Sequence, residues 1–160
     1  MKTLLLGISP PQNGDVELYN LKRELLSQYR ETGALIFPPF IPLGTIDQLT
    51  KSKEISQKLQ TLEGIELSRD WYLSSELLGN NLYIKTNIPG SREFWTKTFP
   101  DLDWKCPEGI LMGHNIINVP DLQIPSLHWH VWKLILLAYE SPSPEEHKWW
   151  VEEEINKKPK

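Results

Sequence analysis

The sequence contains a single cysteine, Cys106, so no disulfide can form within the chain. It also contains no run of eighteen apolar residues, which excludes a recognisable transmembrane helix. Basic residues are few: 17 Lys and Arg stand against 21 Asp and Glu, and the formal charge is −4. Binding of long duplex nucleic acid needs a concentrated basic face, so we do not expect that partner. We expect a cytoplasmic protein of a reducing compartment, with no membrane partner.

Several motifs of known chemistry are absent. The chain has no glycine-rich phosphate loop and no Gly-x-Ser-x-Gly nucleophile elbow. His128 and His130 stand two residues apart and would share one face of a strand, where they could bind a metal together with His114 or Asp121. A third ligand at a recognisable spacing is lacking. We therefore favour polar patterning of a strand, and we expect neither a metal nor a cofactor.

The periodicity of apolar residues predicts the order of the elements. A length of 160 residues with 39% hydrophobic content suits one core, and we expect a single domain over residues 1–144. In chain order we expect a strand at 3–8, a helix capped by Asp15, an irregular strand at 34–46, a helix that starts at Asp47 or Thr50 and is closed by Gly64, strands at 65–74 and 81–87 joined by a turn at 79–81, a helix capped by Ser91, and strands at 110–119 and 130–139. This order predicts the α+β class with mostly antiparallel sheets.

The segment 145–160 is strongly charged. Trp149, Trp150 and Ile155 would place an apolar stripe on a final helix, whereas the glutamates at 152–154 and the lysine tail would stay in water. We therefore predict a charged C-terminal helix or tail, which could contact a protein partner.

Tryptophan is abundant, with seven residues in the chain. If the last strand at 130–139 extends back to Trp129 and is regular, Trp129 and Trp132 lie on its opposite faces. Packing in the core accounts for one of them. The other, for which Trp132 is our candidate, could stack a base of a bound ligand.

The stretches 4–11 and 35–43, together with the order of the elements, resemble the 2H phosphoesterase superfamily, which includes cyclic phosphodiesterases and RNA 2′,5′-ligase-like proteins. The resemblance covers nearly the whole chain to about Ser141 and implies a two-lobed fold with helices packed outside the sheets. Members of the family carry His-x-Thr after an aromatic residue and a proline. This chain has Phe40 and Pro42 in the places of the histidine and the threonine.

The second motif of the family can be aligned with this chain in two ways. In the first, residues 113–117 carry the motif, with His114 as the catalytic histidine and Ile116 in the place of the hydroxyl residue. In the second, residues 107–111 carry it, with Glu108 and Ile110 in those places. We prefer the first alignment, and the second remains open.

In the family, one histidine takes a proton from the attacking group while the other protonates the leaving ribose oxygen. Each such acid or base typically contributes about a hundred- to ten-thousand-fold to the rate, so a chain with His114 alone should have lost most turnover. We expect binding of a small phosphorylated ligand or short RNA end, namely a nucleotide, a cyclic nucleotide or an RNA terminus. Alternatives are an active phosphodiesterase in which His114 works with Glu108 or Tyr83, and a non-catalytic protein-interaction module. The candidate ligand-binding residues are Phe40, Pro42, Tyr83, Lys85, Glu108 and Trp132.

Overall fold

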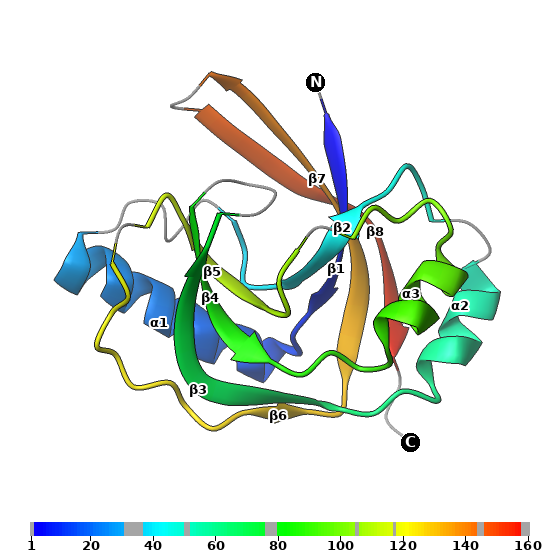
Figure 1. Ribbon diagram of the computed structural model, residues 1–160, viewed down its shortest axis with the longest axis horizontal. Coiled ribbons are helices and arrows are strands. Elements are labelled where there is room, and N and C mark those ends of the chain that lie inside the picture. Colours follow the sequence, from blue (N-terminus) through cyan, green and yellow to red (C-terminus); the bar gives the residue numbers. More distant parts are fainter. Residues whose placement is uncertain are drawn as a thin grey trace.

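The computed structural model describes residues 2–30, 37–49, 52–75, 80–104, 106–116, 118–143 and 146–157. In these ranges the chain forms three helices and eight strands (Figure 1). The helices are α1 (Gln12–Tyr29), α2 (Ser52–Leu59) and α3 (Arg92–Thr98). The strands are β1 (Thr3–Ser9), β2 (Ile41–Thr45), β3 (Ile65–Ser74), β4 (Asn81–Thr86), β5 (Gly109–His114), β6 (His128–Trp129), β7 (Trp132–Ser143) and β8 (Glu146–Lys157).

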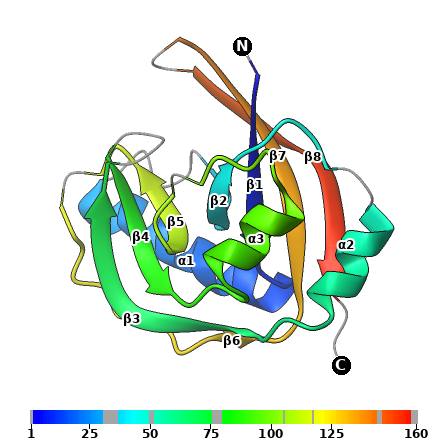
Figure 2. The same cartoon turned by 45° about the vertical axis from the view of Figure 1, so that its right-hand side comes forward.

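The strands form two antiparallel sheets, which confirms the predicted α+β class. One sheet has the order β2-β1-β7-β8, and the other has the order β5-β4-β3-β6. Figure 2 shows the two sheets on opposite sides of the molecule, with the distal half of the β7–β8 hairpin extending beyond the other strands. Within the described ranges, no helix has the length and apolar character needed to cross a membrane.

The two sheets share a β-α-β unit of the same connectivity. The unit β1-α1-β2 supplies two neighbouring strands of one sheet, and β4-α3-β5 supplies two of the other, so β2 corresponds to β5. Each of these strands holds one extra residue opposite its neighbour, Leu43 in β2 and Met112 in β5, and so forms a β-bulge. When the two units are aligned at their bulges, each residue of β2 corresponds to one of β5 or of the segment beside it. Pro42 then corresponds to Leu111, Phe40 to Gly109 and Thr45 to His114.

The buried side chains fall into two clusters that lie on opposite faces of the strands. The larger cluster packs against the helices, and strand residues such as Leu6, Leu134 and Met112 join it; we call this side the helix face. The smaller one, the aromatic cluster, lies on the other side, the aromatic face. Its described members come from strands or from the segment just before β2: Leu5, Phe37, Phe40, Tyr83, Leu111, Ile135 and Leu137.

Much of the local structure agrees with the sequence analysis. The strand predicted at 65–74 is β3 with the same bounds. Ser91 caps α3, and its hydroxyl accepts a hydrogen bond from the amide of Phe94 over 3.0 Å. The beginning of the strand predicted at 34–46, the helix start at Thr50 and Gly79 of the predicted turn lie outside the described residues.

The predicted cap of the first helix was wrong. Pro11 is the N-cap of α1, and Asp15 lies inside the first turn, where its amide donates to the Pro11 carbonyl over 2.9 Å. Gly14, also in the first turn of α1, packs directly against Trp129. A Cβ at Gly14 would lie 2.5 Å from the indole nitrogen of Trp129.

The predicted C-terminal helix was also wrong, since residues 146–157 form β8. This strand pairs with β7 along its length, and β7 itself extends beyond the strand predicted at 130–139, to Ser143. The burial repeats every second residue at the end of the strand, where Ile155 and Lys157 are buried and Asn156 is exposed. Pairing with a long strand therefore overrides the helix propensity of the glutamates.

Two other strands differ from the expectation. The strand predicted at 110–119 ends at His114, because Asn115 adopts a positive φ of 57° that strand residues do not have. The last strand, predicted from His130, begins at Trp132. Trp129 belongs to the separate strand β6, and both tryptophans are buried in the larger cluster. The prediction that they occupy opposite faces of one strand was wrong.

Candidate functional site

The β-bulge in β5 decides which way His114 faces. Tyr83 of β4 lies opposite Leu111, whereas Asn81 lies opposite His114, so two steps along β4 match three steps along β5. Residues opposite each other in a sheet point to the same side, as do residues two apart on a strand. Leu111 and His114 therefore both lie on the aromatic face with Tyr83, although they are three residues apart. The extra residue, Met112, points into the helix-face core.

His114 is oriented by its neighbour Asn81. The His114 Nδ1 lies 2.8 Å from the Asn81 Oδ1, and the Asn81 Nδ2 makes a long contact of 3.5 Å with the Tyr83 hydroxyl. With the amide in this orientation, its oxygen accepts from His114, so the proton is on Nδ1. In the neutral imidazole, the lone pair is then on Nε2. Asn81 is fully buried and His114 is half-buried.

The end of β5 is tied down on the other side as well. The Asn80 side-chain amide donates to the Ile116 carbonyl over 2.6 Å, and the Ile116 amide donates to the Asn80 carbonyl over 3.2 Å. Asn115, directly after His114, has the left-handed conformation that asparagine tolerates. These contacts hold the backbone around His114.

A strip of aromatic rings extends from His114 along the aromatic face. The ring of Phe37 meets that of His114 edge-on at a centroid distance of 6.2 Å, and it meets Tyr139 in the same way at 5.6 Å. Tyr139 of β7 lies directly opposite Trp149 of β8, so both point to this face. Trp149 is 37% exposed. We call His114, Phe37, Tyr139 and Trp149 the aromatic strip.

Three of the ligand-binding residues expected from the sequence form the floor of this region. Phe40 and Tyr83 belong to the aromatic cluster and have no exposed surface, and Pro42 is buried opposite Gly7. Tyr72 stacks on Tyr83 at 5.5 Å and covers it. These side chains support the aromatic face from below instead of lining it.

The other two candidates on this side lie far from His114. Lys85 is exposed and, two residues beyond Tyr83, shares the aromatic face. It lies opposite Gly109, the residue after the exposed Glu108. Asn81 and Lys85 are four residues apart on β4, which corresponds to about 13 Å. Lys85 and Glu108 thus mark the opposite end of the face from His114.

Trp132, the last predicted ligand-binding residue, is not part of this site. It is fully buried in the larger cluster, and the ammonium of Lys157 lies 5.5 Å from its ring centroid. The sequence pattern does not identify Phe37, Asn81 and Tyr139 as site residues. It predicts Trp149 on a C-terminal helix and not beside them. Their convergence depends on strand register, which the sequence does not display.

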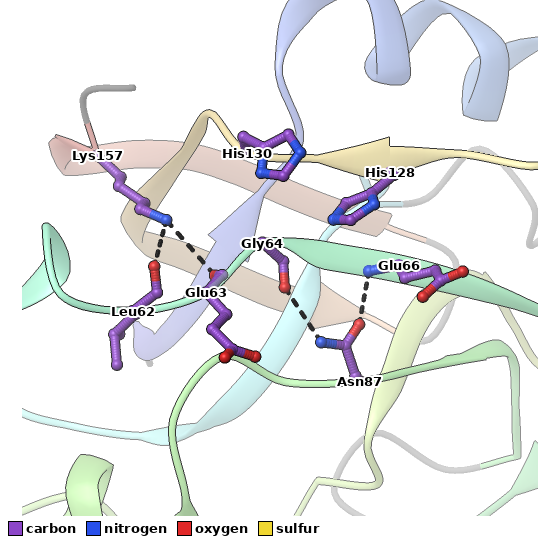
Figure 3. Close-up of a pocket in the computed structure, with 8 residues that line it drawn as sticks. All are labelled: Leu62, Glu63, Gly64, Glu66, Asn87, His128, His130 and Lys157. Atoms are coloured by element: carbon purple, nitrogen blue, oxygen red, sulfur yellow. Dashed lines mark hydrogen bonds between the residues drawn. The ribbon is translucent and has the colours of Figure 1, made fainter. Parts of the chain in front are cut away.

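A cavity of about 650 Å³ lies on another part of the surface (Figure 3). Its polar groups bind the neighbouring main chain: Lys157 donates to the Leu62 and Glu63 carbonyls, and the Asn87 amide group contacts Gly64 and Glu66. The cavity is lined by Leu62, Glu63, Gly64, Glu66, Asn87, His128, His130 and Lys157.

The two histidines of this cavity do not form a metal site. The rings of His128 and His130 stack at 4.4 Å with an angle of 29° between their planes. Lone pairs of imidazole lie in the ring plane, so nearly parallel rings do not aim them at one ion. No group of three or more His, Cys, Asp or Glu side chains among the described residues is arranged to hold a metal. The aromatic face is therefore the stronger candidate site.

Comparison with protein-family models and with curated proteins finds no match for this chain.

Proposed function

We propose that this protein is a divergent 2H phosphoesterase-like protein that binds a nucleotide, a cyclic nucleotide or an RNA terminus on its aromatic face, with weak or no phosphodiesterase activity. The observation that carries the proposal is the placement of His114. Its ring is oriented by Asn81 and lies at one end of the aromatic strip, 6.2 Å from the ring of Phe37. A hydrogen-bonding imidazole at one end of an aromatic strip whose other end, Trp149, is 37% exposed suits a ligand with both a phosphate and a base.

The architecture supports this reading. Two β-α-β units of the same connectivity place β2 and β5 side by side, joined where the Leu111 amide donates to the Phe40 carbonyl over 2.8 Å. The sequence resemblance implies two catalytic positions on neighbouring strands of two lobes, with Phe40 in the first. A groove between such strands would bring a ligand into contact with both units.

The loss of turnover follows from what stands at the related positions. The correspondence between the units relates Phe40 to Gly109 and Pro42 to Leu111. None of these four side chains can transfer a proton or donate a hydrogen bond. His114 corresponds to Thr45 instead, and it lies past the bulge, one position further along the aromatic face than Leu111. The imidazole thus lies beside the two related positions and occupies neither of them, so it is better placed to bind a phosphate than to drive hydrolysis.

Binding can persist because the contacts it needs are present. Bases of every kind stack on aromatic side chains, and Tyr139 and Trp149 offer such surfaces beside Phe37. His114 lies opposite Asn81, and Lys85 lies four residues further along β4, so the two positions are about 13 Å apart along the strands and can both supply hydrogen-bond donors or charge. A nucleotide or a short RNA end fits this spacing better than a long duplex does.

The alternative of an active phosphodiesterase is less well supported. A second acid or base must reach the same phosphate as His114, but Glu108 lies beyond the far end of the β4–β5 pairing, on the order of 13 Å away. Tyr83 is closer, yet its side chain has no exposed surface. Neither residue is placed to complete the reaction.

The proposal is tested with adenosine 2′,3′-cyclic monophosphate, 2′-AMP and a 2′,5′-linked dinucleotide. A ligand that prefers the folded protein raises its thermal midpoint, so we expect a shift with at least one of them. The shift should vanish in His114→Ala and persist in His128→Ala, a matched control in the separate cavity. Product analysis of the same mixtures should show little or no hydrolysis.

Two outcomes would overturn the proposal. Efficient hydrolysis that disappears in His114→Ala would establish the active enzyme instead. Absence of any shift at millimolar ligand would remove nucleotide binding and favour the protein-interaction module. In that case the exposed Trp149, Trp150 and Val151 of β8 are the surface to examine.

A further inference from the structure

A lysine lies in the interior of this protein. Lys22 of α1 has no exposed surface, and it shares the buried face of the helix with Leu18, Leu21 and Leu25. Burial of an amine among apolar side chains is costly unless hydrogen bonds compensate for the lost water. Consistent with this, burial lowers the pKa of Lys22 to about 7, an effect that Asp15 partly opposes. Such a residue calls for a specific role.

The contact that Lys22 makes lies ninety residues away in the sequence. Its Nζ donates to the main-chain carbonyl of Met112 over 2.9 Å. Met112 is the extra residue of the bulge in β5, the one that has no partner opposite it in β4. A bulge interrupts the ladder of hydrogen bonds at its extra residue, and a carbonyl left unpaired in the interior destabilises the structure. Lys22 satisfies that carbonyl from the helix.

The same bulge decides where His114 points. If β5 were regular, Met112 would take a paired position and every later residue would shift by one. His114 would then point to the helix face, away from Phe37 and the rest of the aromatic strip. The bulge therefore has to be stable for the site to exist.

We propose that Lys22 is a positioning residue for the aromatic-face site: from α1 it holds the Met112 carbonyl, stabilises the bulge in β5, and so keeps His114 on the aromatic face. Both the protonated and the neutral amine carry an N–H donor, so the contact is kept in either state. The effect on ligand binding rests on the proposed function, but the effect on the direction of His114 does not.

The test compares Lys22→Met, which keeps the length and apolar character of the side chain but removes the donor, with Leu18→Ala. Leu18 is equally buried, one turn earlier in α1, and belongs to the same core. NMR spectra report the nuclear Overhauser effect between the rings of His114 and Phe37, and the nitrogen shifts report the His114 tautomer. We expect both signatures to be lost in Lys22→Met and retained in Leu18→Ala.

A second measurement uses the unaltered chain, in case Lys22→Met does not fold. With Met112 labelled at its carbonyl carbon, the signal should move as the Lys22 amine titrates, because the two groups are hydrogen-bonded. The proposal would be overturned if the carbonyl signal did not follow that titration. It would also be overturned if Lys22→Met kept the nuclear Overhauser effect between the rings of His114 and Phe37.

Ligand binding separates this inference from the proposed function. If adenosine 2′,3′-cyclic monophosphate binds the wild type, Lys22→Met should weaken it as much as His114→Ala does. Undiminished binding in Lys22→Met would contradict the positioning role. If no nucleotide binds the wild type while the His114 signatures still depend on Lys22, the positioning role stands and the proposed function fails.

Discussion

Phe40 and Leu111 form an antiparallel bridge between the two sheets, in which the Leu111 amide donates to the Phe40 carbonyl over 2.8 Å. The ring of Phe40 has no exposed surface and packs over Gly7 of β1. The junction between the sheets thus depends on an aromatic side chain where the resemblance places a catalytic histidine. In this chain the position is part of the core, which accounts for its apolar character.

The absence of a side chain at Gly7 should be essential for this junction. A Cβ there would lie 2.5 Å from Phe40 Cδ2 and 3.0 Å from the Ile41 carbonyl oxygen. We expect Gly7→Ala to lower the free energy of unfolding by about 1–3 kcal/mol, as overpacking of cores does. Urea denaturation measures this change. In a Phe40→Leu background the same substitution should cost less, and an equal cost in both backgrounds would contradict the steric explanation.

The C-terminal segment should behave as part of the folded sheet. Ile155 is buried opposite Leu134, whereas Val151, on the same strand, is 44% exposed. We expect Ile155→Ala to lower the free energy of unfolding by about 2–4 kcal/mol, and Val151→Ala to change it by less than about 0.5 kcal/mol. Denaturation curves of the two variants provide the comparison. Equal, small effects would mean that the segment does not pack as β8.

The features that could be predicted from the sequence are those encoded locally. Ser91 caps α3 because the hydroxyl and the amide it binds are three residues apart, and the apolar pattern of β3 lies within its own span. The glutamates at 152–154 are a case in which the local sequence led to a wrong prediction. Their local preference favours a helix, but the preceding strand β7 offers a long partner, and pairing with it determines the structure.

The candidate site was less predictable for the same reason. His114 could be singled out from the sequence, but the face it occupies depends on a one-residue shift between β4 and β5. That shift is supported by Lys22, which in the sequence is recognisable only as a charged residue within the apolar stripe of a helix. Asn81 contacts His114 because of the register, and no spacing rule reveals it.

The buried Lys22 should make stability depend on pH above neutrality. In the unfolded chain its pKa is near 10.5, and in the folded chain burial lowers the pKa to about 7. Between these values the unfolded state binds a proton that the folded state does not, so stability rises with pH across this window. Below pH 7 the amine is protonated in both states. Its contribution to the free energy of unfolding then no longer changes with pH and is at its least favourable value.

This contribution can be isolated with Lys22→Met. We expect the difference in unfolding free energy between wild type and Lys22→Met to move in favour of the wild type from pH 7 to pH 10. The limiting slope is about 1.4 kcal/mol per pH unit. Urea denaturation at several pH values measures it, and other titrating groups cancel because both proteins carry them. A difference that stays constant over this range would show that the amine is not buried as described.

The two neighbouring tryptophans of β8 offer the sharpest test of the aromatic strip. Trp149 lies opposite Tyr139 on the aromatic face, whereas Trp150 lies opposite Ala138 on the other face and its indole N–H donates to Glu152 over 2.9 Å. Both are 37% exposed, so their removal exposes similar surface. If a base stacks on the strip, Trp149→Ala should weaken binding of a 2′,5′-linked dinucleotide by about 1–3 kcal/mol. Trp150→Ala should leave the affinity unchanged. Isothermal titration calorimetry measures both, and an equal loss in the two variants would show that the ligand does not bind along the strip.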